Sequence, residues 1–315
     1  MTASWVRAAS PGFPARLREI PDSPAGLWMR TRLAGAELTE SVWARPTVAI
    51  VGARAASGAG LSLARELAWD LARRGVVIVS GLARGIDAAA HEGALLADGV
   101  TVAVLGCGID ACYPPEHAEL ARRVECSGVL LSEWPERTPA RPFRFPQRNR
   151  LVSGLGDVLI LVEGTARSGA LHTVAFAVQQ GREVMAVPRD PHLPGSVAPN
   201  RLIRDGAAPA MGAGDVLATL AALGAPGRED VAWAGRRLRP SIPASPPATG
   251  DGDSTALRRR VEQRLSRGDG ITSQQLAESL PGTDAAALLA EVLTLEIEGR
   301  LVRDGAGRLR VSADA

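Results

Sequence analysis

TVAIVGARAASGAGLSLARELAWDLARRGVVIVSGLARG, residues 47–85, is the stretch that decides the fold of this chain. Residues 47–51 are apolar without alternation, which predicts a strand buried on both faces of a parallel sheet. A helix follows from Ser57 to a glycine stop at Gly75. Its apolar positions recur at i, i+3, i+4 and i+7: Ala64, Leu67, Ala68 and Leu71. Residues 76–80 predict a second buried strand, so the stretch is a βαβ unit.

Both of these strands end in glycine loops. Backbone N–H groups at a helix start, unobstructed by Cβ atoms, form a site for phosphate. A nicotinamide-binding Rossmann domain usually places Asp or Glu after its second strand, but Ser80 and Gly81 stand there in this chain. We therefore expect a cradle for several phosphates and no dinucleotide cofactor. The loop residues assigned to this cradle are Gly52, Arg54, Ser80, Gly81, Arg84 and Gly85.

Composition limits the function further. The chain has 315 residues, and its 36 positive side chains are all arginine, which excludes the lysine-dependent Walker loop. The net charge of +2 requires any nucleic-acid surface to be a local patch. Cys107, Cys112 and Cys126 lack CxxC spacing, so neither a disulfide framework nor a metal site is expected. The chain shows no secretory signal and no run of 18 apolar residues, which favours the cytoplasm and no membrane insertion.

The composition divides the chain into four parts. Residues 1–45 predict an extended lead-in packed on the core, with one short strand near 27–30. Residues 46–223 predict an α/β domain, an extended Rossmann-like and mostly parallel sheet with helices on both faces. Residues 224–254 are a Pro/Gly-rich linker, and 255–315 predict three helices and a hairpin, a small winged helix-turn-helix domain.

The segment after the fourth predicted strand is the most cationic part of the α/β domain. Arginine for phosphate and exposed rings for base stacking are what a sequence-tolerant single-strand site requires. The segment interleaves Phe143 and Phe145 with Arg137, Arg141, Arg144, Arg148 and Arg150, with Asn149 between the last two. A third anion-type loop, 163–169, carries Arg167, Ser168 and Gly169 after the fifth strand.

Two features leave alternatives open. Asp87 and His91 share a helix face, either as a general acid/base pair or as a first-turn carboxylate with a histidine packed behind it; we favour the second. The would-be recognition helix of the winged domain is acidic, with Asp284, Glu291, Glu296 and Glu298, which disfavours a duplex groove and favours a protein contact. Its first helix, with Arg258, Arg259, Arg260, Arg264 and Arg267, is the alternative nucleic-acid face.

Taken together, these loops resemble the DNA-processing protein A (DprA/Smf) family. The matching stretches include 48–54, 80–87, 101–106, 145–150 and 200–203, and they span roughly residues 13–220. The resemblance implies a protein that binds single-stranded DNA, dimerises and loads the RecA recombinase onto incoming DNA in natural transformation, with no established catalytic activity. By family motif it implies DNA contacts for Arg54, Arg84, the Arg148-Asn149-Arg150 element and Ser168-Gly169.

This sequence departs from the family pattern in places. Ala53 replaces the usual Ser or Thr, and Arg167 stands where lysine is common. Arg189 occupies a position where glycine is usual, so we assign the loop 189–199 no role. A nucleotide-cleaving hydrolase, with Glu163 as acid or base and Arg54 orienting the nucleotide, is the alternative function. A transcriptional regulator acting through the winged domain is a third.

Overall fold

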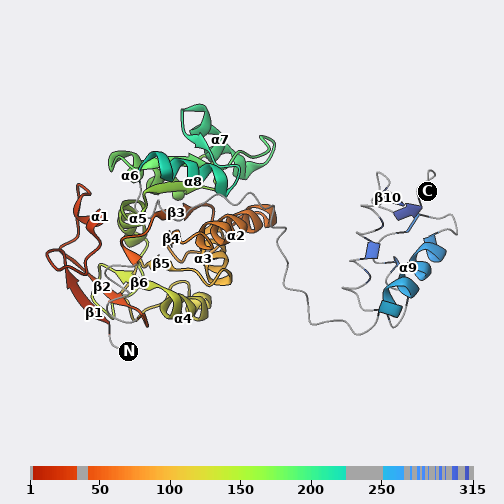
Figure 1. The fold of residues 1–315 in the computed structure, drawn as a ribbon, viewed down its shortest axis with the longest axis horizontal. Helices are drawn as coiled ribbons and strands as arrows, with labels where there is room; N and C mark the ends of the chain where they lie inside the picture. The colour runs from red at the N-terminus through yellow and green to blue at the C-terminus, as the bar shows by residue number, and fades with distance from the viewer. Residues whose placement is uncertain are drawn as a thin grey trace. The chain divides into compact units, whose positions relative to one another are not determined.

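The computed structural model describes most of the chain in two compact units, Met1–Trp233 and Ala234–Ala315 (Figure 1). In the first unit it describes residues 3–33 and 42–224. In the second it describes residues 251–265, 270–271, 275–276, 279–280, 283, 288, 291–292, 295, 300–303 and 309–311. The predicted linker therefore lies mostly outside the described residues, and its last four positions begin a helix.

The described residues of the first unit form a nine-stranded sheet in the order β1-β2-β6-β5-β4-β3-β7-β8-β9. Strands β3 to β9 run parallel, whereas β1 and β2 add an antiparallel edge beside β6. This confirms the predicted α/β class. The strands are β1 Ser4–Arg7, β2 Gly26–Arg30, β3 Thr47–Val51, β4 Val77–Ser80, β5 Thr101–Val104, β6 Val129–Ser132, β7 Val158–Leu161, β8 Glu183–Ala186 and β9 Ala208–Pro209.

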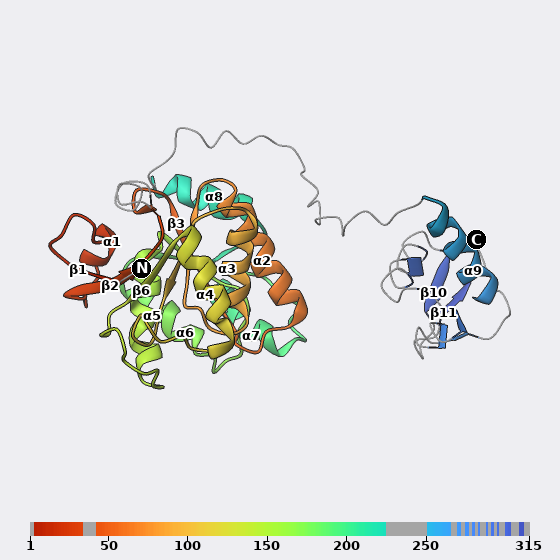
Figure 2. The same cartoon turned by 90° about the horizontal axis from the view of Figure 1, so that it is seen from below.

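Helices cover both faces of this sheet. Buried residues of α2, α3 and α8 pack on one face, and those of α1, α5 and α6 pack on the other. Figure 2 shows α2, α3 and α4 side by side. The helices are α1 Ala15–Arg18, α2 Gly58–Ala72, α3 Ile86–Leu96, α4 Ala118–Ser127, α5 Arg144–Leu155, α6 Ala170–Gln179, α7 Val197–Arg204 and α8 Ala213–Ala222.

Helix α2 forms as its sequence predicts. Ser57 caps its start, with the hydroxyl accepting a hydrogen bond from the Gly60 amide at 3.0 Å. Gly75 follows its end with a φ of 78°, a conformation that glycine adopts without steric cost. The predicted apolar stripe, Ala64, Leu67, Ala68 and Leu71, is buried. The glycine loop of β3 therefore leads into a rigid helix.

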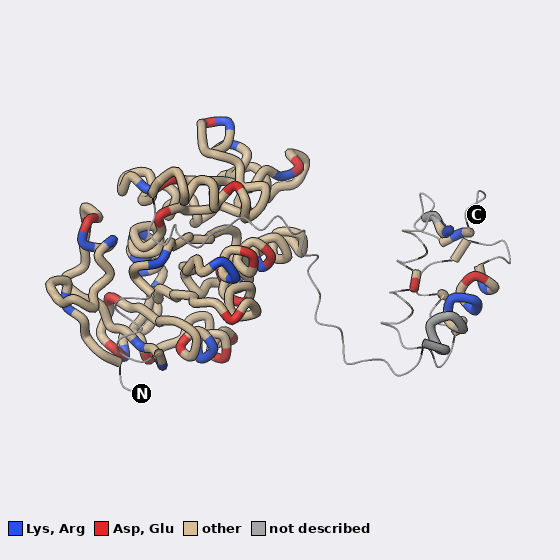
Figure 3. The backbone as a smooth tube through the Cα atoms, in the orientation of Figure 1, with Lys and Arg blue, Asp and Glu red and all other residues tan. Residues whose placement is uncertain are grey.

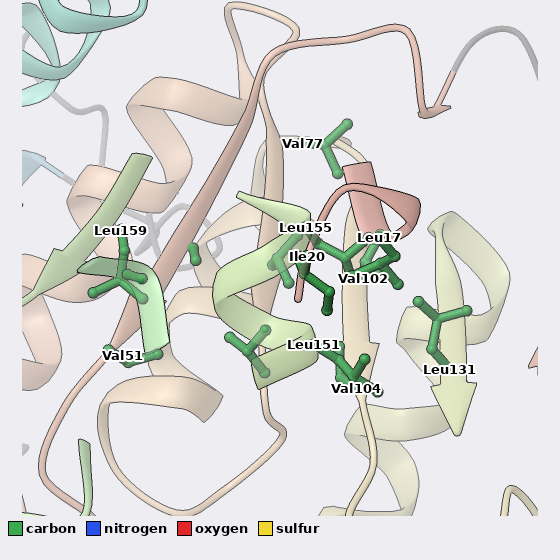
Figure 4. Packing of buried hydrophobic residues seen from close by; sticks show 14 of the residues in the cluster. Leu17, Ile20, Val51, Val77, Val102, Val104, Leu131, Leu151, Leu155 and Leu159 are labelled. Carbon is green, nitrogen blue, oxygen red and sulfur yellow. The ribbon is translucent and has the colours of Figure 1, made fainter. Parts of the chain in front are cut away.

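Helix α5 was not predicted, because Arg144–Leu155 begins with charged residues and a proline. Pro146 lies in the first turn, where a missing N–H breaks no intrahelical bond. Leu151 and Leu155 then pack with Leu17 of α1 against strand residues such as Val102 and Val104 (Figure 4). This packing fixes the start of α5, with Phe145 and Arg148, at the carboxyl ends of the strands.

The lead-in is more regular than predicted. It supplies β1, α1 and β2, and only the strand near residues 27–30 was expected. Arg16 fastens it to the core: its guanidinium donates two hydrogen bonds to the Asp157 carboxylate, at 2.7 and 2.9 Å, and one to the Trp43 carbonyl. In the described residues, the lead-in therefore contributes two strands, β1 and β2, to the sheet.

The second unit has its own small core. Helix α9 Asp251–Leu265 and the hairpin of β10 Leu301–Arg303 and β11 Leu309–Val311 enclose buried apolar side chains such as Val261, Leu276 and Leu295. Most of the residues predicted to form the second and third helices, including Asp284, Glu296 and Glu298, lie outside the described residues. The winged-helix assignment thus stays a prediction.

Among the described residues, no helix combines the length and the apolar character needed to cross a bilayer. Arginines and acidic residues are interspersed over the elements of the first unit (Figure 3). Any binding surface must therefore be built locally, from a few side chains.

Candidate nucleic-acid interface

An open groove of about 580 Å³ lies at the carboxyl ends of β3 and β4, between the starts of α5 and α6. The chain sends α2 to one face of the sheet after β3 and α6 to the other face after the neighbouring β7. Such a switch point leaves a crevice in which α/β proteins bind ligands. Of the predicted site residues, Gly52, Arg54, Gly81, Phe145, Arg148, Asn149, Ser168 and Gly169 line this groove.

Arg54, Phe145 and Tyr113 form a stacked group on one wall of the groove. The Arg54 guanidinium carbon lies 5.5 Å from the centroid of the Phe145 ring, and the Tyr113 ring centroid lies 5.2 Å from it. Arg54 is exposed and Tyr113 is 40 % exposed. Phe145 is half-buried against Gly106, where a Cβ atom would lie 2.6 Å from its ring. The wall thus offers a cation and aromatic surface on a fixed support.

Tyr113 was missed by the sequence analysis. It is the only tyrosine of the chain, but it precedes Phe145 by 32 positions in a loop without an anion-type pattern. Pro142, Thr165, His172 and Thr173 also line the groove and were missed. Pro142, His172 and Thr173 belong to no glycine loop motif, so only their closeness in space reveals them. Thr165 lies in the anion-type loop 163–169 but was given no role.

Arg148 occupies the floor of the groove in a way the sequence did not predict. Its side chain is buried, with the residue 3 % exposed, and Nη1 donates hydrogen bonds to the carbonyl oxygens of Gly81, at 2.5 Å, and Val104. Burial lowers the pKa of Arg148 to about 10, an effect that Asp87 opposes, so the guanidinium remains charged at neutral pH. Arg148 therefore braces the β4 and β5 ends and does not present its charge to solvent.

Gly81 and Asp87 complete this floor. A Cβ atom on Gly81 would clash with the Arg148 guanidinium, so a larger residue there would displace Arg148 from its hydrogen bonds. The Gly81 amide donates to the Asp87 carboxylate at 3.1 Å. Burial raises the pKa of Asp87, although Arg148 and backbone hydrogen bonds lower it in part.

Some amides of the glycine loops donate hydrogen bonds inside the protein and are therefore not open to a phosphate. The Ala53 amide donates to the Glu163 carbonyl at 2.7 Å, and the Ile86 amide donates to the Ala53 carbonyl at 3.2 Å. Gly85, with a φ of 76°, lies against the Ala53 carbonyl, and Gly52 lies against Ile86. These glycines allow three loops to pack closely. Among the side chains of the groove, Arg54 offers a cation and Phe145 and Tyr113 offer rings to a ligand.

The other predicted residues lie around or away from the groove. Arg84 is exposed at its rim beside Arg54 and Tyr113, and it pairs with Glu116 at 2.5 Å. The hydrogen bond with Glu116 raises the pKa of Arg84. Arg167 is exposed on the loop after β7, next to Ser168. These two arginines can reach a ligand that extends beyond the groove.

Besides Arg84, Gly85 and Arg167, three more predicted residues lie outside the groove lining. Ser80 is fully buried and donates to the Ile50 carbonyl at 2.7 Å. Arg150 is buried and pairs with Asp22 and Glu133, each at 2.7 Å. Phe143 is 55 % exposed and carries the Arg144 guanidinium at 5.3 Å from its ring centroid. Ser80 and Arg150 serve the fold in this arrangement.

His91 does not pair with Asp87. Its Nδ1 lies 2.7 Å from the Thr101 hydroxyl, which itself donates to the Ile78 carbonyl, so His91 Nδ1 is the donor in this contact. Burial lowers the pKa of His91 to about 3, which keeps the ring neutral. The geometry supports the packed histidine and not the acid/base pair.

Glu163, the residue on which the hydrolase alternative depends, lies outside the groove lining. Its side chain is 7 % exposed and accepts hydrogen bonds from the Ser57 amide, at 3.2 and 3.3 Å, and from the Ser57 hydroxyl at 2.9 Å. Arg189 Nη2 lies 3.5 Å from the same carboxylate. A carboxylate enclosed in this way has no access to a substrate in the groove.

Comparisons with known proteins identify the family of this chain. The family model described as DNA recombination-mediator protein A matches residues 4–221. Protein Smf of Escherichia coli is 34 % identical over 307 residues, covering 97 % of this chain and 77 % of that protein. DNA processing protein DprA of Bacillus subtilis is 37 % identical over 215 residues, covering 68 % of this chain and 70 % of that protein.

Two solved structures share the fold. DprA of Streptococcus pneumoniae superposes with a TM-score of 0.64 at 34 % identity, over 69 % of this chain and 74 % of that one. DprA of Helicobacter pylori, whose structure is described in terms of a unique single-stranded DNA binding mode, gives 0.62 at 26 % identity, over 70 % and 97 %. The match extends across the sheet and the groove, and the chain belongs to the DNA recombination-mediator protein A family, that of the DprA and Smf proteins.

Proposed function

We propose that this protein binds single-stranded DNA in the groove and acts as a recombination mediator. In this role it protects incoming DNA and loads the RecA recombinase during natural transformation, as a homodimer in the cytoplasm. The observation that carries the proposal is the stacked group of Arg54, Phe145 and Tyr113 beside an open groove of about 580 Å³.

The stacked group suits a single strand better than a duplex. A single strand presents both a phosphate and the face of an unpaired base. The Arg54 guanidinium, 5.5 Å from the centroid of the Phe145 ring, can bind the phosphate while the ring stacks on the base. A duplex keeps its base faces stacked inside. Within the described residues, no carboxylate forms an ion pair with Arg54, so its charge is available for phosphate.

The remaining groove residues fit the same ligand. Asn149, Ser168 and Thr173 add polar groups to the groove lining. Arg84 and Arg167 lie beyond the lining, where the next phosphates of a bound strand would pass. We assign Arg148, Arg150, Ser80, Gly52, Gly81 and Gly85 to positioning these groups, and Phe143 to a flanking contact.

Binding measurements with matched oligonucleotides test this function. Fluorescence anisotropy should show that oligothymidylate binds at least about tenfold more tightly than a duplex of the same length. Its affinity should fall steeply with salt and depend little on sequence. Equal affinity for the duplex would contradict the proposal.

Recombinase loading and dimerisation require separate tests. The full chain should speed the assembly of RecA on single strands that are already coated with single-strand-binding protein. Its mass in solution should be that of two chains. A monomer that binds DNA but leaves RecA assembly unchanged would restrict the protein to DNA binding.

A further inference from the structure

A carboxylate of the protein itself occupies the start of α2. The first turn of a helix offers unpaired N–H groups and the positive end of the helix dipole, and Rossmann-type proteins commonly hold a phosphate there. In this structure the Ser57 amide and hydroxyl donate instead to Glu163, at distances of 2.9 to 3.3 Å. Glu163 thus takes the place of an external anion.

A buried arginine faces the same position. Arg189, from the loop after β8, is 7 % exposed at its side chain, and its Nη2 donates to the Ser57 hydroxyl at 3.1 Å. Its Nε is buried and has no hydrogen-bond partner among the described residues. An anion with more than two oxygens could satisfy Nε, which the two oxygens of Glu163 leave unpaired.

The surrounding backbone leaves no room for a second anion beside Glu163. A Cβ atom on Gly60 would clash with Glu163 Oε2, and one on Gly195 would lie 2.7 Å from Glu163 Cδ. The carboxylate therefore fills the space between α2 and the loop after β8. A phosphate could enter only if the carboxylate left.

We propose that Ser57, Arg189 and the first turn of α2 form a phosphate-binding pocket, the α2 anion pocket, which the chain closes with its own Glu163. Glu163 is then a specificity-determining residue. It keeps inorganic phosphate and nucleoside monophosphates out of a site that the fold would otherwise offer them. The attached carboxylate has a high effective concentration and cancels the charge of Arg189, so free phosphate does not displace it. This inference concerns a pocket distinct from the groove and does not depend on DNA binding.

Thermal unfolding of the full-length Glu163→Ala variant in phosphate tests the proposal. Without the carboxylate, Arg189 becomes an unpaired buried charge and the variant loses stability. Phosphate should then raise its melting temperature by about 4 °C at ten times its dissociation constant, relative to chloride of equal ionic strength. The wild-type protein should show a smaller shift, due only to weak binding elsewhere. The double variant E163A/R189A should lose the additional shift.

Two results would overturn the proposal. One is an equal effect of phosphate on the wild type and on E163A. The other is a folded E163A variant without any phosphate effect beyond that of E163A/R189A. Should E163A fail to fold in either buffer, Glu163→Gln replaces it. This variant has a side chain of the same size but no charge to hold it beside Arg189, so a phosphate can displace the neutral amide from the pocket. Phosphate must then raise its melting temperature more than that of the wild type, and the absence of this difference would count against the proposal.

Oligothymidylate binding by the same samples separates this inference from the proposed function. E163A should retain its affinity for the strand within about twofold of the wild type, because the groove side chains are unchanged. A wild type that does not bind the strand contradicts the proposed function alone. An unchanged phosphate response contradicts the α2 anion pocket alone.

Discussion

The groove and the α2 anion pocket lie at the same edge of the sheet, yet their arginines have opposite environments. Arg54 is exposed, lies over an aromatic ring and forms no ion pair within the described residues. Arg189 is 7 % exposed at its side chain and is matched by Glu163. Both are adjacent to glycine loops. The contrast shows that an arginine near such a loop keeps its charge fully available to a ligand only where the protein supplies no anion of its own.

The largest effect should be a loss of stability in Arg148→Ala, which tests the contrast with an arginine of the groove itself. Arg148 lines the groove but is paired internally, as Arg189 is. Its removal leaves the Gly81 and Val104 carbonyls without their donor and Asp87 without a nearby cation, which should cost about 3–5 kcal/mol of stability. Urea unfolding measures this loss. A variant as stable as the wild type that binds DNA weakly would show instead that Arg148 is a DNA ligand.

Arg54→Ala should weaken oligothymidylate binding about 10- to 100-fold without changing stability. The reason is the loss of a charge-assisted contact of about 1.5–3 kcal/mol to phosphate. Anisotropy titration gives the affinity, and Arg204→Ala, an exposed arginine of α7, is the matched control. Equal losses in both variants would indicate a general charge effect and remove the special role of the groove.

Phe145→Leu should weaken the same binding by a smaller factor, about fivefold. Leucine keeps the packing on Gly106 but provides no ring for a base, and a stacked base contributes about 1–3 kcal/mol. Phe143→Leu, outside the groove lining, should change affinity less. If Phe143 proves the more sensitive position, bases stack at the rim and the groove assignment needs revision.

The smallest effect should be a gain in DNA affinity. Glu116→Gln frees Arg84 from its exposed ion pair, which makes Arg84 resemble Arg54 and should tighten oligothymidylate binding about two- to fivefold. The dependence of log affinity on log salt should steepen by about 0.7, the value for one more phosphate contact on a single strand. An unchanged slope would show that the strand does not pass Arg84.

The sequence predicted the parallel core because its signals are local. Each signal decides one element. The apolar run Thr47–Val51 predicts a strand, and Ser57 and Gly75 mark the two ends of the helix that follows. The antiparallel edge was largely missed, because Ser4–Arg7, in which only Val6 is half-buried, carries no alternation that marks a strand. Helix α5 was missed because its start reads as a charged segment.

The candidate site was predictable only in part, for a different reason. Residue type told which groups could bind phosphate, but not which of them are already partnered. Arg148 and Arg150 pair with carbonyls and carboxylates far away in sequence, and some loop amides donate to carbonyls of neighbouring loops. Tyr113 joins Phe145 only through the folded chain. Such long-range pairing has no signature in a single motif.

One pairing has a practical implication for dissecting this protein. Arg150 ties α5 to Asp22 of the lead-in. Phe145 and Arg148 precede Arg150 on the same helix and line the groove. Trimming the chain from its amino end would therefore disturb a surface from which no residue had been deleted. If such a fragment binds DNA more weakly, the reason would be that α5 has lost its ion pair with Asp22. The result would not show that the missing segment contacts DNA.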